Sequence, residues 1–420
     1  MESWDAVVVG AGAAGLLAAA RSAERGRKTL LIEKNRRPGV KILMSGGTRC
    51  NLTQATDQRG IIEAFGVQGK FLHSGLAAFG PQDLVQLIEA EGVPTKTEPT
   101  GKIFPVSDKA ADVLGALTRR LERSGCVLAM AEPVQSLGRT GNCFEVTTGR
   151  RVLSAATLAI TTGGCSYPGC GTSGDGYLWA AKFGHTIVPP RPALVPVETN
   201  LAWVHELKGI TVADVSVAVV ERGTSDPAAN AGRLRRPLAA RRGSFLFTHF
   251  GFSGPVVLDV SRAITGHPQP SALDLVCDFL PALADAEFDN QLRQRAAAEG
   301  KQGVAAILPN DLPRRLVDAL LESVDVSRNL RCAELGKAAR SRLVQVFKNC
   351  AIPVNGTLGF RKAEVTAGGV SLAEIDSRSM ESRIVPNLYL AGEILDLDGP
   401  IGGYNFQSAF STGWLAGAHL

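Results

Sequence analysis

Three glycines near the start of the chain have the spacing of a phosphate-binding turn. Gly10, Gly12 and Gly15 follow the apolar run AVVV directly and precede the run LLAAARSAERG, which predicts a helix. In such a unit the first glycine permits the tight turn, the second lets the backbone approach a pyrophosphate, and the third allows close packing of helix on strand. The helix N-terminus at Ala13 and Ala14 offers free N–H groups to phosphate. The motif therefore predicts a dinucleotide site.

An acidic residue, Glu33, closes the next predicted strand, TLLIE. A carboxylate in this position accepts hydrogen bonds from the ribose of an adenosine. It also repels a 2′-phosphate, so NADP is a poor candidate for this first site. Lys34 follows directly and belongs to the same predicted site. The alternative is a glycine-rich turn without a ligand, and the agreement of glycines, flanking elements and acid argues against it.

A second glycine-bearing segment, GVKILMSGGTRCNLT, follows this strand. Gly46 and Gly47 let backbone N–H groups approach a ligand closely. Lys41 and Arg49 add positive charge, and the side-chain amide of Asn51 suits the polar edge of a flavin. We interpret the segment as a cofactor-lining loop. The alternative is a loop that only turns the chain.

Small residues also end two later predicted strands. The strand ATLAI leads into Thr162, Gly163 and Gly164, which leave room for a second pass by the same ligand. The strand NLYLA ends at Gly392 and Glu393. One nucleotide motif followed by several distant glycine loops predicts one elongated cofactor, which FAD fits better than NAD.

Gly402 and Gly403 open the last predicted helix. The N-terminus of that helix can stabilise negative charge on a reduced flavin ring, and one of the acids Glu393, Asp396 and Asp398 can bind the ribityl hydroxyls. No flavin-attachment signature is visible, so we expect non-covalent FAD. The remaining residues assigned to this site are Ser45, Cys50, Val134, Tyr404 and Asn405.

These motifs carry a resemblance to a known family. The chain resembles the BaiN-type, YhiN-like family of bacterial NAD(P)/FAD-dependent oxidoreductases, the aminoacetone oxidase-like flavoproteins. The shared segments are GAGAAG, KILMSGGTRCNLT, TTGGCSYPGCGTSGDGY, FLFTHFGFSGPVVLDVSR, VTAGGVSLAEID and AGEILDLDGPIGGYNFQSAFSTGWLAG. The resemblance implies a two-lobed flavoprotein. Two departures are Thr48, where glycine is common in the family, and Pro400-Ile401, where an acid and a threonine are more usual.

The composition of the chain changes at residue 189 and again near residue 353. Proline-rich and alternating strand-like segments follow the first change, and residues 282–350 are helical and charged. Beyond the second change, the glycine loops of the cofactor site return. The fold class predicted is α/β, with a Rossmann-like FAD-binding domain built from both chain ends (1–188 and 353–420) and an inserted β-rich and helical substrate domain (189–352).

The composition and net charge of the chain limit which binding partners we expect. The chain has 420 residues and a formal net charge of +5, so a nucleic-acid partner is not expected. No apolar run is long enough for a membrane span, and the acidic start MESWD shows no secretory signal. Eight scattered cysteines are typical of free thiols in a reducing cytoplasm. No metal site is expected, and the sequence does not indicate an oligomeric state.

Two patterns suggest redox sites of a different kind. GCGTSG, residues 169–174, is a second formal G-x-G-x-x-G, but no acid closes the strand after it, so we interpret it as a loop of the flavin domain rather than as an NAD domain. Cys165 and Cys170 have the spacing of a redox dithiol. In disulfide reductases that pair follows the first nucleotide unit, where this chain has only Cys50, so we interpret both as packed thiols.

A candidate proton donor lies in the segment THFGFSGP. His249 can protonate a substrate carbon that takes hydride from a flavin, and a histidine that only caps the turn is an equal alternative. Tyr167 and Tyr404 are weaker candidates. Arginines also gather in one predicted loop, where solvation is the usual role and binding of NADPH phosphate or RNA is the alternative; these are Arg233, Arg235, Arg236, Arg241 and Arg242.

The sequence thus predicts an FAD-dependent oxidoreductase that acts on a small organic substrate. The preferred reaction is reduction of a conjugated C=C bond, with NAD(P)H as a transient co-substrate. One alternative is an amine or aminoketone oxidase that uses O2. Another is an RNA-associated flavoprotein whose insert binds nucleic acid.

Overall fold

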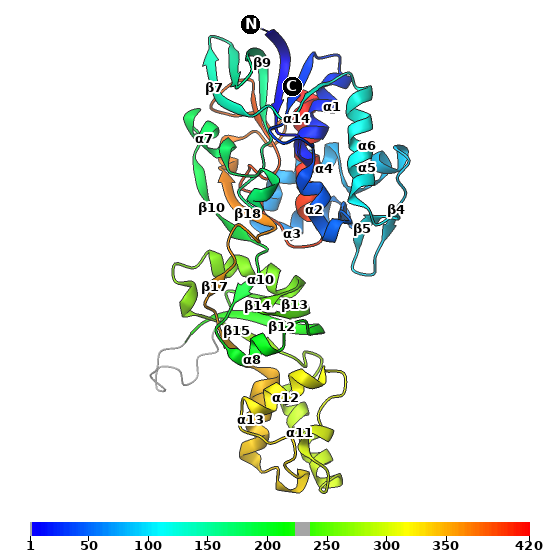
Figure 1. The fold of residues 1–420 in the computed structure, drawn as a ribbon, viewed down its shortest axis with the longest axis vertical. Coiled ribbons are helices and arrows are strands. Elements are labelled where there is room, and N and C mark those ends of the chain that lie inside the picture. The colour runs from blue at the N-terminus through cyan, green and yellow to red at the C-terminus, as the bar shows by residue number, and fades with distance from the viewer. Residues whose placement is uncertain (1, 223–235) are drawn as a thin grey trace. The chain divides into compact units, whose positions relative to one another are not determined.

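The computed structural model describes residues 2–222 and 236–420, and the chain forms two compact units (Figure 1). The split unit combines Met1–Pro192 with Ala363–Leu420, and the inserted unit is Ala193–Lys362. Residues 353–362, which the sequence analysis gave to the C-terminal part, lie in the inserted unit. The reason is a strand pair there, β17 (Gly356–Thr357) with β11 (Val197–Glu198).

A seven-stranded sheet forms the core of the split unit, in the order β6-β2-β1-β9-β8-β7 with β19 paired to β9. The strands β6, β2, β1, β9 and β19 pair in parallel, and β8 and β7 add an antiparallel edge. Parallel strands covered on both faces read as continuous apolar runs, which explains the buried TLLI of β2. The bounds are β1 (Glu2–Val9), β2 (Thr29–Ile32), β6 (Val127–Ala129), β7 (Val134–Thr140), β8 (Cys143–Thr148), β9 (Val152–Ile160) and β19 (Leu388–Leu390).

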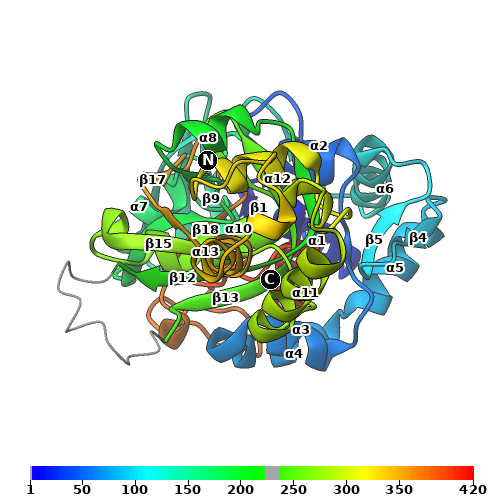
Figure 2. The same cartoon turned by 90° about the horizontal axis from the view of Figure 1, so that it is seen from below.

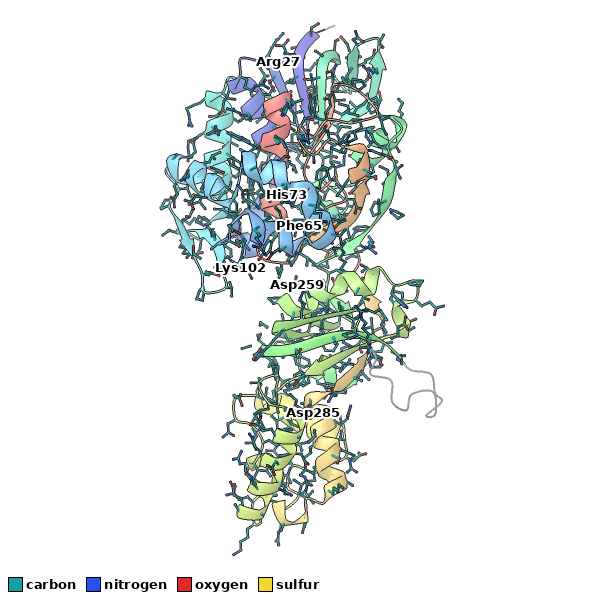
Figure 3. The ribbon with its side chains drawn as sticks, turned by 180° about the vertical axis from the view of Figure 1, so that it is seen from behind. Arg27, Phe65, His73, Lys102, Asp259 and Asp285 are labelled. Atoms are coloured by element: carbon teal, nitrogen blue, oxygen red, sulfur yellow. The ribbon has the colours of Figure 1, made fainter. Side chains whose placement is uncertain are left out.

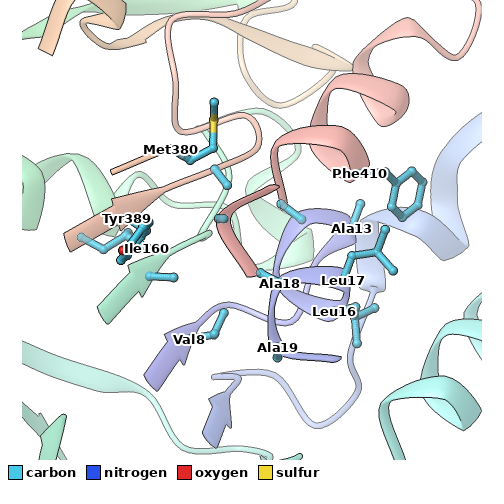
Figure 4. Packing of buried hydrophobic residues seen from close by; sticks show 14 of the residues in the cluster. Val8, Ala13, Leu16, Leu17, Ala18, Ala19, Ile160, Met380, Tyr389 and Phe410 are labelled. Carbon is cyan, nitrogen blue, oxygen red and sulfur yellow. The ribbon is translucent and has the colours of Figure 1, made fainter. Parts of the chain in front are cut away.

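Two helices from opposite ends of the sequence pack together beside this sheet, α1 (Ala13–Glu24) and α14 (Tyr404–His419). Figure 4 shows Ala13, Leu17 and Phe410 in the buried apolar cluster that they share with the strands. Alanines fill most of the buried face of α1, which lets the neighbouring backbone come close. Further helices of this unit are α2 (Val40–Thr48), α3 (Gln58–Ala64), α4 (His73–Ala78), α5 (Pro81–Ala90), α6 (Ala110–Arg123) and α7 (Asp175–Lys182).

Two small sheets complete the split unit. One has the order β3-β5-β4, and its β4 and β5 form a hairpin. The other pairs β10 with β18. Their bounds are β3 (Thr53–Gln54), β4 (Thr95–Thr97), β5 (Lys102–Pro105), β10 (Ile187–Ala193) and β18 (Val365–Val370).

The inserted unit has its own core around a second seven-stranded sheet, in the order β16-β15-β12-β13-β14-β11-β17. Helix α10 (Pro255–Thr265) packs on β12 and β13. Helices α11, α12 and α13 lie together in a group (Figures 1 and 2). The other bounds are α8 (Ala202–Glu206), β12 (Thr211–Glu221), β13 (Ala239–Thr248), β14 (Gly251–Ser253), β15 (Leu273–Asp278), α11 (Asp285–Ala298), α12 (Arg314–Glu322), α13 (Lys337–Lys348) and β16 (Cys350–Pro353). Within the described ranges, no helix is long and apolar enough to cross a membrane.

Candidate functional site

The three glycines of the first turn have different local surroundings. Gly10 has φ +104°, and a Cβ there would lie 2.8 Å from the carbonyl oxygen of Thr161. A Cβ on Gly15 would lie 1.9 Å from the carbonyl oxygen of Gly10. Gly12 differs, because its φ of −83° suits any residue and a Cβ there would meet no atom within 4 Å. The protein fold itself therefore requires glycine at positions 10 and 15, and the open space at Gly12 fits a ligand such as a pyrophosphate.

Glu33 is buried at the end of β2, with 8% of its surface exposed. One carboxylate oxygen accepts the backbone N–H of Ala11 at 2.8 Å, and the other accepts that of Asn35 at 2.8 Å. Each oxygen keeps a further lone pair, so the carboxylate both braces the glycine turn and can accept a ribose hydroxyl. The amine of Lys34 lies 2.5 Å from Asp175 and 2.6 Å from the hydroxyl of Ser173, at the start of α7.

The segment after β2 is a short helix that breaks at its end. Residues Val40–Met44 are helical, which the sequence analysis did not predict, and the chain leaves helical geometry at Ser45. Gly46 and Gly47 have φ of +55° and +67°, and Thr48 has φ +70°. A left-handed conformation in a β-branched residue costs on the order of 1–3 kcal/mol, and such strain gathers at functional sites. A Cβ on Gly47 would meet no atom within 4 Å, so this turn also borders open space.

Arg49 and Asn51, both assigned to the cofactor, have protein partners. Arg49 pairs with Glu98 at 2.7 Å. With its amide oriented by its hydrogen bonds, Asn51 donates to the carbonyl of Thr53 at 3.0 Å and accepts the N–H of Gly403 at 3.0 Å. Asn51 thereby joins the segment after α2 to the glycines before α14.

Cys50 lies between them and is fully buried. Burial raises the pKa of its thiol to about 12. The thiolate is the reactive form of cysteine, so Cys50 acts here as a packed apolar side chain.

Glu393 connects its own segment to three others. Its carboxylate accepts the amine of Lys41 at 2.5 Å, the hydroxyl of Ser166 at 2.7 Å and the backbone N–H of Thr366 at 3.0 Å. Gly164 lies against it, since a Cβ there would lie 2.9 Å from a Glu393 oxygen. Lys41 and Glu393 were predicted to line the cofactor. Ser166 and Thr366 were missed, because no spacing in the sequence links them to Glu393.

The hydroxyl of Thr162, at the end of β9, is buried without a hydrogen-bond partner among the described residues. Neighbouring Gly163 has φ +73°, so the backbone turns sharply at this point. Buried hydroxyls are normally hydrogen-bonded. The carboxyl ends of parallel strands are where ligands bind in open α/β sheets, so this unpaired hydroxyl fits a bound polar group.

The start of α14 is fixed by hydrogen bonds and close contacts. Asn405 makes two hydrogen bonds with the backbone of Gly399, at 2.8 Å and 2.9 Å. The ring of Phe65, labelled in Figure 3, lies against the same glycine. Gly403 has φ +94°, and a Cβ there would lie 2.6 Å from the backbone of Thr53. Tyr404 begins the helix and is half-buried.

Two other predicted positions have different surroundings. Val134 begins β7 and packs against the main apolar cluster. Gly392 has φ +82°, and a Cβ there would lie 2.8 Å from the Cβ of Ala14 on α1. The end of β19 therefore abuts the nucleotide turn.

The second G-x-G-x-x-G does not belong to a second nucleotide fold. The strand that follows α7 is β10, and it pairs with β18 instead of joining β9 in the main sheet. The loop is held by the first nucleotide unit, since the amide of Asn35 donates to the carbonyl of Cys170 at 2.9 Å. All eight cysteines of the chain are free.

His249 lies exposed in the turn between β13 and β14, with its ring 4.9 Å from that of Phe250. Arg241 and Arg242 belong to strand β13 rather than to a loop, and Arg242 pairs with Asp214 at 2.7 Å. Arg233 and Arg235 lie outside the described residues.

The sequence profile described as the HI0933-like protein Rossmann domain matches residues 4–419. The chain belongs to this family. The match confirms the resemblance and the Rossmann-like fold class expected from the sequence, and the HI0933-like family comprises FAD-dependent oxidoreductases.

Similar proteins of known name cover nearly the whole HI0933-like chain. The ribosomal RNA dihydrouridine synthase of Escherichia coli is 34% identical, over 100% of this chain and 98% of its own. The protein of the same name from Haemophilus influenzae is 31% identical, over 97% and 96%. The 3-dehydro-bile acid delta(4,6)-reductase of Clostridium scindens is 30% identical, over 98% and 97%.

Proposed function

We propose that this protein binds FAD and reduces a C=C bond conjugated to a carbonyl group, with NAD(P)H as the electron donor. The observation that carries the proposal is the turn at Gly12. A Cβ there would meet no protein atom within 4 Å, so the space beside this glycine is open to a ligand. Full-length similarity to enzymes named for such reductions supports the reaction class. A cytoplasmic location, where NAD(P)H is supplied, fits this role.

Different residues of the split unit would bind different parts of FAD. The turn at Gly12 and the N-terminus of α1 would hold the pyrophosphate, and Glu33 would accept a ribose hydroxyl. The glycines before α14 and the N-terminus of that helix would border the flavin ring and stabilise negative charge on it. When bound, FAD supplies the hydride chemistry, which no side chain can provide.

For the substrate, we propose a uracil base in ribosomal RNA. The two relatives with 34% and 31% identity both carry the name ribosomal RNA dihydrouridine synthase. Saturating the C5=C6 bond of uridine is reduction of a C=C bond conjugated to a carbonyl, so it lies within the predicted reaction. The positive net charge of the chain lies mostly in its insert, which suits a polyanion. A 3-oxo steroid diene is the second candidate, on the strength of the bile-acid reductase.

The overall reaction needs one proton in addition to the hydride. Uridine, NAD(P)H and H⁺ give dihydrouridine and NAD(P)⁺. We propose His249 as the proton donor, because it lies exposed in the turn between β13 and β14 and histidine is the most common general acid of enzymes.

An anaerobic assay tests the proposal. Purified protein should be yellow and release FAD on acid extraction, and NADPH or NADH should bleach it. Unmodified ribosomal RNA should then restore the colour and gain dihydrouridine, read by nucleoside mass spectrometry. Recolouring by a 3-oxo-4,6-diene steroid but not by RNA would favour the second candidate. Reduction by an amine, with peroxide formed in air, would favour the oxidase instead.

A further inference from the structure

The left-handed turn at the end of α2 lies against a cluster of side chains from outside it. The carbonyl oxygen of Ser45 accepts the backbone N–H groups of Arg49 and Cys50, the latter at 3.1 Å. These hydrogen bonds close the loop over Gly46, Gly47 and Thr48. Thr48 has an unfavourable φ of +70° in this loop, and Arg49 is the next residue in the chain. Contacts that fix Arg49 therefore also restrain the backbone of Thr48.

Arg49 is fixed by the β4–β5 hairpin. Its guanidinium lies 2.7 Å from Glu98 and 3.5 Å from Asp108, and its central carbon lies 4.0 Å from the ring centre of Phe104. The same ring backs the turn, since a Cβ on Gly46 would lie 3.2 Å from it. We call Arg49, Glu98, Asp108 and Phe104 the arginine clamp. The clamp ties one side chain of the turn to a hairpin that is itself well packed, with Phe104 2% exposed.

The charges of the clamp argue against a direct role for Arg49 in holding an anion. Two carboxylates already neutralise its guanidinium, and the second of them, Asp108, also pairs with Lys96 at 2.5 Å. A phosphate brought to Arg49 would meet Glu98 and Asp108 as well, and like charges at close range repel.

We propose that Arg49 is a positioning residue, which stabilises the left-handed conformation of Thr48 so that the Gly46–Gly47 backbone is presented to the flavin. The proposal rests on the proposed binding of FAD. The proposal couples two neighbouring residues. The left-handed backbone of Thr48 costs conformational energy, and the contacts of the arginine clamp offset that cost. A residue at position 48 that adopts positive φ freely should therefore make the clamp dispensable.

The test is a double-mutant cycle on apo and FAD-loaded protein. The variants are Arg49→Gln, Thr48→Gly and the two combined, with Thr48→Asn as a second strain-free residue. Arg59→Gln is the matched control, because Arg59 pairs with Glu63 on an exposed face of α3. FAD affinity is measured by flavin fluorescence, and hydrogen exchange is measured for peptides covering residues 44–51 of the apo protein.

Arg49→Gln should weaken FAD about tenfold and speed exchange across residues 44–51, as expected when about 1.4 kcal/mol of strain is no longer offset. Adding Thr48→Gly should bring both values back to within about twofold of the parent. Glu98→Gln should act in the same direction as Arg49→Gln, because it loosens the clamp. Arg59→Gln should change neither value.

Three results would overturn the proposal. Weaker FAD binding in Arg49→Gln without faster exchange, and without rescue by Thr48→Gly, would mean that Arg49 touches the cofactor directly. Tighter FAD binding in Glu98→Gln would point the same way, since it frees the guanidinium. Unchanged exchange in every variant would show that the clamp does not hold the turn. Exchange is read on the apo protein, so it tests the clamp even if the parent fails to bind FAD, a failure that would count against the proposed function alone.

Discussion

Gly413 of α14 lies so close to Ala14 of α1 that a Cβ on the glycine would be 2.3 Å from the alanine carbonyl oxygen. One turn further on, Gly417 makes the same approach to Ala18, at 2.4 Å. The helices therefore run parallel, and both N-termini point the same way. Helix α14 begins nine residues before Gly413, whereas α1 begins one residue before Ala14, so the N-terminus of α14 lies about eight residues, or roughly 12 Å, beyond that of α1. Two offset positive helix ends suit a long cofactor with a phosphate at one point and a ring at another.

The contrast between Gly12 and Gly15 yields a matched pair of variants. Gly12→Ala should keep the fold and its melting temperature but lose FAD, because the new methyl group enters only the space reserved for the pyrophosphate. Gly15→Ala should lower the free energy of unfolding by about 1–3 kcal/mol or more, because its methyl group collides with the backbone of Gly10. Flavin content and thermal melts of the apo proteins separate the two effects. Full FAD content in Gly12→Ala would contradict the assigned turn.

The cysteines should take no part in electron transfer. Burial raises the pKa values of Cys165 and Cys170, which disfavours the thiolate that a redox dithiol needs. The double variant Cys165→Ser/Cys170→Ser should keep its FAD and most of its turnover. Anaerobic titration should show no long-wavelength charge-transfer band in the parent protein. Such a band, present in the parent and lost in the variant, would establish a dithiol after all.

Buried His185 should make stability depend on pH. Its ring lies 3.1 Å from Glu374 and 2.8 Å from the hydroxyl of Ser382, and burial lowers its pKa below the ordinary value of about 6.5, against the opposing effect of Glu374. A group whose pKa is lower in the folded state stabilises the fold above the unfolded pKa and loses that contribution as pH falls. One such group changes the free energy of unfolding by at most about 1.4 kcal/mol per pH unit.

Denaturant unfolding between pH 5 and 8 checks this. The parent should lose stability below about pH 6.5, whereas His185→Gln should show a flatter profile. His73, an exposed histidine labelled in Figure 3, provides the control, and His73→Gln should follow the parent curve. Parallel curves for the parent and His185→Gln would show that His185 does not titrate on folding.

The proposed proton donor can be isolated by timing the two half-reactions in a stopped-flow instrument. His249→Ala should slow reduction of the uracil or enone substrate by roughly 10²–10⁴-fold while sparing reduction of the flavin by NAD(P)H. His267→Ala, in the same inserted unit, should leave both rates unchanged. Equal losses in both half-reactions would make His249 structural, and no loss in either would remove it from the site.

The first βαβ unit could be predicted from sequence in some detail. Local rules sufficed for the strand, turn and helix because these elements follow one another directly in the sequence, and the structure adds that Gly10 and Gly15 are crowded whereas Gly12 is not. The helical start of α2 was missed, because its few residues run straight into Gly46 and Gly47 and leave no helical period to recognise.

Contacts between segments that are far apart in the sequence could not be predicted from local sequence patterns. Asn51 was expected to face a flavin, and its partner is Gly403, far away in the sequence. One of the acids Glu393, Asp396 and Asp398 was expected to bind the ribityl chain, and the oxygens of Glu393 are shared among Lys41, Ser166 and Thr366. Side chains such as these are chosen by tertiary structure, since a carboxylate or amide takes whichever donors the fold brings to it.

The split unit is made from the two ends of the chain, so its parts are synthesised at different times. During translation β1, α1 and β2 leave the ribosome early, and the whole of Ala193–Lys362 follows before β19 and α14 emerge. Domains tend to fold as they appear, so the insert can fold while the face of α1 that Gly413 and Gly417 will cover is still bare. Capture of the cofactor is thereby deferred until the last helix has been made, and an unfinished chain would hold no flavin to reduce.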